Sequence, residues 1–248
     1  QNANIPTSNF WKVKSLEEAK KIIHSSSSPL VVKADGLASG KGVFIPDSKD
    51  ECFRAAESIF NGKFGNSGNV VVLEEKIQGP EVSVFALCDG KKYILLPSAQ
   101  DHKRLNEKDK GPNTGGMGAY SPAKIINKKI EKKIINTIIK PTLLSLKKKG
   151  KHYKGFLYVG LMIKDNVPYL IEFNVRMGDP ECQAILPRLK TDIVKIILNS
   201  VNNKLKNTKI KWNKKKCMTI VLCSKGYPNN YKKNQLIKNM DKINIEKN

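Results

Sequence analysis

Apolar residues recur at helical spacing in several stretches of the chain. The longest stripe runs through Ile126, Ile130 and Ile134 with lysines on the opposite side, which is typical of a helix with one packed and one solvated face. Another stretch starts at Ser15, three residues before Glu18, in the pattern of a capping box. From these patterns we predict helices at 15–23, 47–60, 125–144 (with a kink at Pro141) and 193–201.

Short runs rich in β-branched residues predict strands between these helices. Residues 81–88 connect through Asp89-Gly90 to 92–96, which indicates an antiparallel hairpin. Residues 97–123 show little periodicity and are expected to form one long loop, which in a compact domain is usually functional. The other expected strands are 30–34, 43–45 and 70–75, with a second hairpin made by 156–163 and 168–173.

The net charge of +23 raises the hypothesis of a nucleic-acid partner. The excess, however, lies in 124–154 and 201–248, and it consists almost entirely of lysine alternating with Ile and Asn. Base recognition favours arginine, and single-strand binding favours interleaved aromatic residues. We therefore interpret the lysines as solvated faces and expect no specific nucleic-acid partner, although a Lys-rich nucleic-acid-binding module stays as an alternative.

The five cysteines are odd in number and none is in CxxC spacing, and the three histidines are scattered, so we expect neither a disulfide framework nor a structural zinc site. Free thiols favour a cytoplasmic location. No apolar run approaches the ~18 residues of a membrane span, so no membrane association is expected. The chain opens on Gln1 and closes on a run of Asn, Lys and Ile, which indicates a fragment of a longer protein.

The most informative stretch is 169–181, in which Glu172, Asn174 and Arg176 are spaced two residues apart. On one buried strand this spacing puts all three side chains on the same face. Such a set needs a partner, and Mg²⁺ with nucleotide phosphates is a suitable one, because oxygen ligands suit the cation and Arg suits phosphate. The alternative is a strand end whose polar residues face water.

The segment 33–42 resembles a phosphate-binding loop but is not a Walker A motif, because Gly42 stands where Ser or Thr is required. A glycine flap over a nucleotide fits better, with Lys33 and Lys41 neutralising phosphates. A plain glycine hairpin turn is the alternative interpretation.

Two further segments carry candidate chemistry. Glu74-Glu75-Lys76-Ile77, followed by Glu81, suits a hinge beside an adenine, with a carboxylate for the ribose. The long loop contains Asp101-His-Lys-Arg104, with charges of both signs, and the glycine-rich run 111–118, which permits close approach of backbone to a ligand. His102 is a candidate general base, although a hydrogen-bonded structural histidine is the commoner case.

The order of these segments resembles the ATP-grasp ligases. The blocks QDHKR, GPNTGGMGAYSP and IEFNVRMGDPE resemble specifically the glycinamide ribonucleotide synthetase (phosphoribosylamine–glycine ligase) family. The resemblance covers about residues 5–200 densely and 214–235 thinly. It implies an α+β fold of two lobes, with mainly antiparallel sheets clasping the nucleotide. The implied domains are a small lobe with its lead-in segment at 1–80, a large lobe with the metal site at 81–210, and the start of a truncated C-terminal domain at 211–248.

The family joins glycine to 5-phosphoribosylamine through a glycyl phosphate, using ATP and Mg²⁺ or Mn²⁺, in de novo purine synthesis. The resemblance implies a small-molecule enzyme, for which we favour a monomer. The roles that it implies follow: Glu172 and Asn174 hold the metal; Lys33, Gly40, Lys41, Gly42, Glu74, Lys76, Ile77 and Glu81 bind ATP; Arg176, Asp101 and Lys103 are catalytic; and Asn113, Thr114, Gly115, Gly116 and Asp179 bind substrates.

Three departures from the family pattern stand out. The family's first domain is not in this sequence, most of its last domain is not either, and 156–163 holds no second acidic metal ligand. A different ATP-grasp carboxylate–amine ligase and a catalytically inactive relative are therefore kept as alternatives.

Overall fold

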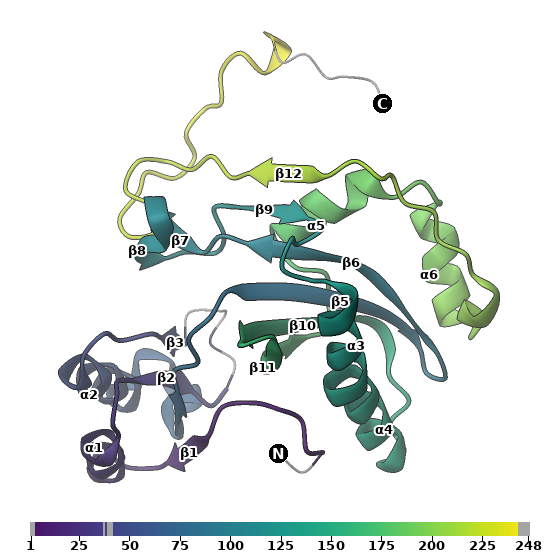
Figure 1. Cartoon of the computed structure of the whole chain (residues 1–248). Coiled ribbons are helices and arrows are strands. Elements are labelled where there is room, and N and C mark those ends of the chain that lie inside the picture. The colour runs from purple at the N-terminus through teal and green to yellow at the C-terminus, as the bar shows by residue number, and fades with distance from the viewer. Residues whose placement is uncertain (1–2, 37, 39–41, 243–248) are drawn as a thin grey trace.

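The computed structural model describes residues 3–36, 38 and 42–242 of the chain (Figure 1). Two antiparallel sheets, one of four strands and one of six, organise these residues, and a two-stranded hairpin accompanies them. We call the first two the small sheet and the large sheet. Helices pack on both sheets, which confirms the predicted α+β class. Gly40 and Lys41, expected in the flap, lie outside the described residues.

The small sheet has the order β1-β4-β2-β3. Helices α1 and α2 pack against it, and their apolar faces form a separate core with Leu30, Val32 and Leu73. The predicted cap of α1 is confirmed, because Ser15 Oγ accepts a 3.2 Å bond from the N–H of Glu18. The elements are β1 (Phe10–Val13), α1 (Leu16–Ser25), β2 (Leu30–Ala34), β3 (Val43–Phe44), α2 (Lys49–Ser58), a π-helical turn (Ile59–Lys63), a 3₁₀ turn (Gly65–Gly68) and β4 (Val71–Glu75).

The large sheet has the order β11-β10-β5-β6-β9-β12, with every neighbouring pair antiparallel. Both predicted hairpins are confirmed, and β6 continues beyond the predicted end. The strands are β5 (Glu81–Asp89), β6 (Tyr93–Asp101), β9 (Gly118–Ser121), β10 (Lys154–Lys164), β11 (Val167–Asn174) and β12 (Cys217–Ile220).

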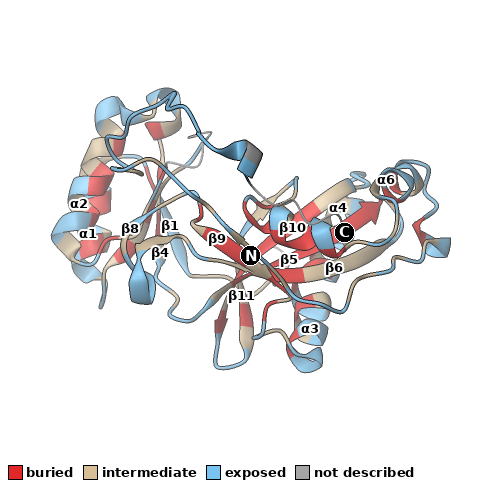
Figure 2. Cartoon of the chain, turned by 90° about the horizontal axis from the view of Figure 1, so that it is seen from above, coloured by how far each residue is buried: buried red, intermediate tan, exposed pale blue. Residues whose placement is uncertain are grey.

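Helices cover both faces of the large sheet (Figure 1). Alternate residues of β5 point to opposite faces, so Val84 packs with Ile130 and Ile134 on one side while Phe85 packs with Ile185 on the other. Strands β5 and β10 are mostly buried, as their red ribbon shows (Figure 2). The helices are α3 (Lys128–Ile134), a π-helical segment (Ile135–Ile139) and α4 (Lys140–Lys148) on the first face, and α5 (Glu181–Ile185) and α6 (Ile193–Val201) on the second.

The prediction of one long loop over 97–123 is wrong. The segment contains the end of β6, the hairpin of β7 (Arg104–Asn106) and β8 (Lys110–Asn113), and β9. Strands β7, β8 and β9 are only three or four residues long, and β9 pairs with β6 and with the distant β12, so local periodicity does not mark them. Short 3₁₀ turns occur at Glu107–Asp109, Leu186–Arg188, Leu205–Asn207 and Met240–Lys242. No helix in the described ranges combines the length and the apolar character needed to cross a bilayer.

Candidate functional site

Strand register gathers a set of polar side chains on one face of the large sheet. Gly160 of β10 lies opposite Ser83 of β5 and opposite Glu172 of β11. Paired residues on antiparallel strands point to the same face, so the side chains of Ser83 and Glu172 lie on the same side of the sheet, the side on which α5 packs. The polar residues that alternation and pairing place on this face are Glu81, Ser83, Asp101, Tyr158, Glu172 and Asn174.

Glu172 and Asn174 lie side by side, as the two-residue spacing predicted. The amide nitrogen of Asn174 donates a 3.1 Å hydrogen bond to Glu172 Oε1. The expectation of a buried strand is wrong here, because β11 is an edge strand and Glu172 is exposed. The expectation that Arg176 continues the same strand is also wrong. The strand ends at Asn174, and the exposed Arg176 guanidinium donates to the carbonyl of Met177 at 2.8 Å.

This pair fits a cation that is shared with a ligand. Mg²⁺ prefers hard oxygen donors and is often held by one or two carboxylates together with substrate phosphates. Among the described residues there is no group of three or more His, Cys, Asp or Glu arranged to hold a metal, so an all-protein site is not formed there. A cation beside Glu172 would favour the flipped amide of Asn174, in which the amide oxygen instead of the nitrogen points toward the Glu172 carboxylate.

Lys103 connects Glu172 and Asn174, which we call the metal pair, to the rest of the candidate site. Its ammonium donates to the carboxylate of Glu81, the first residue of β5. Burial is the largest single influence and lowers the pKa of Lys103, but the charges of Glu81, Tyr158 and Glu172 and the hydrogen bond to Glu81 together outweigh it, and the pKa is raised. Lys103 is therefore a fixed positive charge that interacts with Glu81 and Glu172.

The half-buried Asp101 and the buried Glu181 form an acidic pair. Glu181 is only 2% exposed, and its Oε1 accepts a 2.6 Å bond from Ser83 Oγ, which also lies 3.0 Å from the Tyr158 hydroxyl. Asp101 Oδ1 is buried and has no hydrogen-bond partner among the described residues. Burial, and then the charge of Glu181, raise the pKa of Asp101 to about 7. An unpaired carboxylate oxygen beside a second acid is suited to a cationic ligand group.

The loop Asn113–Gly118, which we call the glycine-rich loop, closes over this acidic pair. Thr114 N–H donates to the Lys103 carbonyl at 2.7 Å, which fixes the loop beside Lys103. Gly116 has φ +117°, and a Cβ there would lie 2.8 Å from Asp101 Oδ1. Glycine at 116 therefore lets the loop backbone pack directly against Asp101 and Pro180, where a side chain would not fit. The predicted substrate residues Asn113, Thr114, Gly115 and Gly116 all belong to this loop.

Asp179 and His102 make mainly local contacts. Asp179 is exposed and accepts a 2.7 Å bond from the side chain of Gln183, one turn along α5. The His102 ring stacks on Tyr120 with 5.9 Å between centroids. This contact favours the structural interpretation of His102 over that of a general base.

The predicted nucleotide residues of the small sheet are paired with one another or with neighbours. Lys33 on β2 forms a 2.6 Å ion pair with Glu74 on β4, and Lys76 lies 3.1 Å from Asp47. Gly42 is buried and its carbonyl accepts from the N–H of Ala34. Ile77, in the connection to β5, is half-buried. A bound nucleotide would compete with Glu74 for Lys33.

Three residues of the site were not predicted from the sequence: Ser83, Tyr158 and Glu181. The signal for Ser83 was a polar residue inside an apolar strand, Val82-Ser-Val-Phe85. Glu181 stands at the end of the most informative stretch but lies on the helix that follows it.

Comparisons with known proteins confirm the resemblance drawn from the three sequence blocks. Residues 1–182 match the family described as phosphoribosylglycinamide synthetase, ATP-grasp (A) domain. The chain is 45% identical over 241 residues to the chloroplastic phosphoribosylamine–glycine ligase of Arabidopsis thaliana, covering 96% of this chain and 45% of that protein. It is likewise 45% identical to the phosphoribosylamine–glycine ligase of Vigna unguiculata, covering 90% of this chain and 72% of that protein.

Among solved structures, the phosphoribosylamine–glycine ligase of Thermotoga maritima matches with a TM-score of 0.84 and 37% identity, over 93% of this chain and 58% of that one. A biotin carboxylase from Campylobacter jejuni matches with a TM-score of 0.66 at 20% identity, which concerns the fold alone. The chain spans about half the length of most of the curated relatives it matches.

Proposed function

Because the chain belongs to the phosphoribosylglycinamide synthetase family through its ATP-grasp (A) domain, we propose that it carries the catalytic site of an ATP-dependent ligase. The reaction joins glycine to 5-phosphoribosylamine, giving glycinamide ribonucleotide, ADP and phosphate in de novo purine synthesis. One observation carries the proposal. Strand register places Glu81, Asp101, Glu172 and Asn174 on one face of the large sheet, and the Lys103 ammonium donates to the Glu81 carboxylate there.

We infer that ATP lies between the small and the large sheets. Lys33 and Gly42, with Gly40 and Lys41, bind its phosphates; Glu74, Lys76 and Ile77 frame the adenine, and Glu81 takes the ribose. The pairing of Lys33 with Glu74, and that of Glu81 with Lys103, keep these charges compensated until the nucleotide replaces one partner. Glu172 and Asn174 would hold Mg²⁺ or Mn²⁺, which supplies charge neutralisation for phosphoryl transfer.

Glycine is proposed to bind with its ammonium at Asp101 and Glu181 and its carboxylate toward Lys103. The ammonium supplies the donors that the buried Asp101 Oδ1 lacks among the described residues. A glycine carboxylate oxygen then attacks the γ-phosphorus, and the bond from that phosphorus to the β-bridging oxygen breaks, which releases ADP and leaves glycyl phosphate. Lys103 and Arg176 stabilise the charge on the transferred group.

The second step needs a free amine. The nitrogen of 5-phosphoribosylamine attacks the carbonyl carbon of glycyl phosphate, the carbon–oxygen bond to phosphate breaks, and the nitrogen loses a proton. The glycine-rich loop, with Asn113, Thr114, Gly115 and Gly116, and the exposed Asp179 are proposed to line this second substrate. No protein nucleophile takes part in either step.

We propose that the protein is located in the cytoplasm, which its five free cysteines support. We also propose that it is a monomer, which size-exclusion chromatography would test. We also propose the boundaries 1–80, 81–210 and 211–248. Separate hydrophobic cores support the first boundary, while β12 extends the large sheet beyond the second boundary.

An assay of ADP release tests the activity. Glycine with 5-phosphoribosylamine should release ADP faster than other amino acids with the same amine. Equal rates with all acids would favour a different ATP-grasp ligase, and no release together with no stabilisation by Mg²⁺-ATP would favour an inactive relative.

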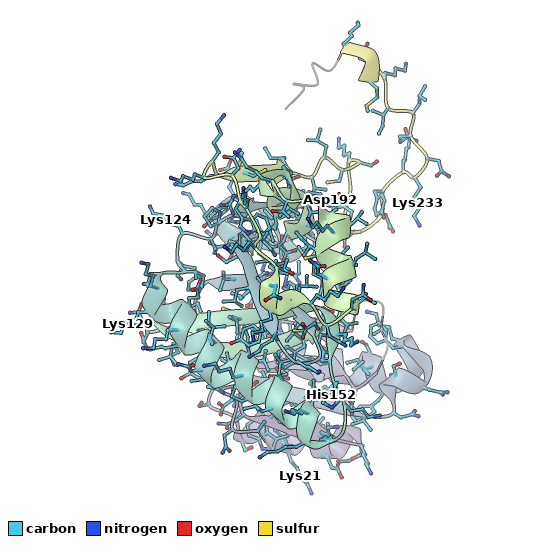
Figure 3. All side chains as sticks on the ribbon, turned by 90° about the vertical axis from the view of Figure 1, so that its right-hand side faces the viewer. Lys21, Lys124, Lys129, His152, Asp192 and Lys233 are labelled. Carbon is cyan, nitrogen blue, oxygen red and sulfur yellow. The ribbon has the colours of Figure 1, made fainter. Side chains whose placement is uncertain are left out.

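The surface lysines bear on the nucleic-acid alternative. Four of them reach outward from different parts of the molecule, an arrangement consistent with solvated faces: Lys21, Lys124, Lys129 and Lys233 (Figure 3). Binding that depends steeply on salt and not on ATP would favour the nucleic-acid module.

A further inference from the structure

The segment 217–231 follows the glycine-rich loop along its outer side. Strand β12 pairs with β9, which begins at the end of the loop, and the N–H of Val221 donates to the Met117 carbonyl at 2.9 Å. In Figure 1 this segment runs past the β7–β8 hairpin after leaving β12. The segment lies outside residues 1–182, the part of the chain that matches the ATP-grasp family.

One side chain of this segment reaches the loop itself. The hydroxyl oxygen of Tyr227 accepts a hydrogen bond from the N–H of Gly115 at 3.0 Å. The neighbouring loop amides donate within 102–118: Thr114 to the Lys103 carbonyl, Gly116 to Thr114 Oγ1 and Met117 to the His102 carbonyl. Among these four loop amides, from Thr114 to Met117, the N–H of Gly115 is therefore the one that bonds to the C-terminal segment.

Tyr227 is itself held in place. Its N–H donates to the Ser224 carbonyl at 3.1 Å, and Gly226 before it has φ +100°, a conformation that favours glycine. The Tyr231 ring packs edge-on against the Tyr227 ring, with 5.4 Å between centroids and 69° between planes. A ring fixed by a turn and by an aromatic neighbour presents its hydroxyl at a defined place.

We propose that Tyr227 is a positioning residue for the glycine-rich loop. Its hydroxyl holds Gly115, and through it the chain on both sides, against the acidic pair of Asp101 and Glu181. Without that bond the outer side of the loop keeps the β9–β12 pairing but loses its anchor at Gly115. The identity of the ligand affected, a phosphorylated sugar amine or its glycyl amide, rests on the proposed function; the anchoring of the loop does not.

The anchoring is tested by amide hydrogen exchange on the 248-residue chain with Tyr227→Phe, which removes the hydroxyl and keeps the ring. One neutral hydrogen bond corresponds to about a three- to tenfold change, so exchange at Gly115 should accelerate by that factor. Tyr231→Phe is the matched control and should leave Gly115 exchange unaltered. Equal Gly115 exchange in the parent and in Tyr227→Phe would overturn the proposal.

The consequence for the site is tested by calorimetric binding of the product, glycinamide ribonucleotide. Its Kd should rise about three- to tenfold in Tyr227→Phe and stay unchanged in Tyr231→Phe, with the Kd of Mg²⁺-ATP unchanged in both. A parallel loss of Mg²⁺-ATP affinity would indicate general damage and would contradict a positioning role. If the parent chain itself fails to bind glycinamide ribonucleotide, the proposed function fails, and the exchange measurement still decides the role of Tyr227.

Discussion

Ser83 on β5 donates a 2.6 Å hydrogen bond to the carboxylate of Glu181 at the start of α5, joining two residues 98 positions apart in the sequence. The bond ties α5, the helix that follows β11, to β5 in the middle of the large sheet. It also gives the buried carboxylate a donor, because a buried charge without one is costly. The acidic pair of the site therefore depends on a serine that forms no part of the predicted site.

Replacing Ser83 by alanine should destabilise the protein by about 1–3 kcal/mol, because Glu181 would stay buried without that donor. Urea unfolding measures the change. Ser25, an exposed serine bonded to the Ile22 carbonyl at 3.0 Å, offers a control, and Ser25→Ala should stay within about 0.5 kcal/mol of the parent. Equal effects of the two substitutions would show that the Glu181 carboxylate does not need Ser83.

The raised pKa of Asp101 predicts a pH-dependent stability. Burial and the charge of Glu181 raise this pKa from 3.8 to about 7, so between those values the folded state keeps a proton that the unfolded state has released. The free energy of unfolding should therefore fall as the pH rises from about 4 to 7 and level off above that range. The side chain keeps partial contact with solvent, and we expect a loss of about 1–2 kcal/mol.

The contribution of Asp101 is isolated by Asp101→Asn, which cannot titrate. The difference in melting temperature between this variant and the parent should grow in favour of the variant from pH 5 to pH 8. Asp165→Asn, in the exposed turn between β10 and β11, is the control and should give a difference that does not vary with pH. A flat difference for Asp101→Asn would mean that Asp101 is ionised throughout this range.

The same carboxyl group predicts a pH dependence of substrate binding under the proposed function. An ammonium group needs an ionised Asp101, so bound glycine must displace the proton that the empty site holds below pH 7. The apparent affinity for glycine should therefore rise with pH up to about 7 and change little above it. A titration of the glycine KM against pH, with the KM for ATP as the reference, measures this effect. A glycine KM that stays constant from pH 5.5 to pH 8 would contradict ammonium binding at Asp101.

The local features of this molecule were predictable, and its long-range contacts were not. The cap at Ser15 and the shared face of Glu172 and Asn174 follow from spacings of three and two residues. The contact of Ser83 with Glu181 depends on which strands become neighbours and on where the chain turns after β11. The short strands β1 and β12 were missed for a related reason: they are largely exposed, so their composition carries no pattern of burial.

Under the proposed function, in which Glu172 and Asn174 hold the metal, Glu172→Gln should lose nucleotide-linked stabilisation. In the parent, Mg²⁺-ATP at 100 times its Kd should add about 2.7 kcal/mol of stability by mass action. The variant keeps the shape of the side chain but removes the carboxylate charge, so the Mg²⁺-dependent part of this stabilisation should be lost. Melting scans with and without a chelator measure it. Glu107→Gln, on the β7–β8 turn, should behave as the parent does, and unchanged Mg²⁺-ATP stabilisation in Glu172→Gln would remove Glu172 from the metal site.

Gly116 tests whether the close approach of the glycine-rich loop to the acidic pair is needed. A methyl group there would lie 2.8 Å from Asp101 Oδ1 and would overlap the ring of Pro180, and the backbone at φ +117° disfavours any side chain. Gly150 also has a positive φ, +72°, but a Cβ there would meet nothing within 4 Å. Gly150→Ala should therefore cost only the backbone strain, about 1–2 kcal/mol.

Gly116→Ala carries the same kind of strain together with the steric overlap, so it should cost clearly more than Gly150→Ala in urea unfolding. At matched folded concentrations it should also weaken glycine binding at least tenfold, because the methyl group would push the loop away from Asp101 and Pro180 and so disturb the acidic pair. Gly150→Ala should leave glycine binding unchanged. If Gly116→Ala bound glycine as tightly as Gly150→Ala does, the ammonium would have to lie elsewhere, and the close packing at Gly116 would serve only the folding of the loop.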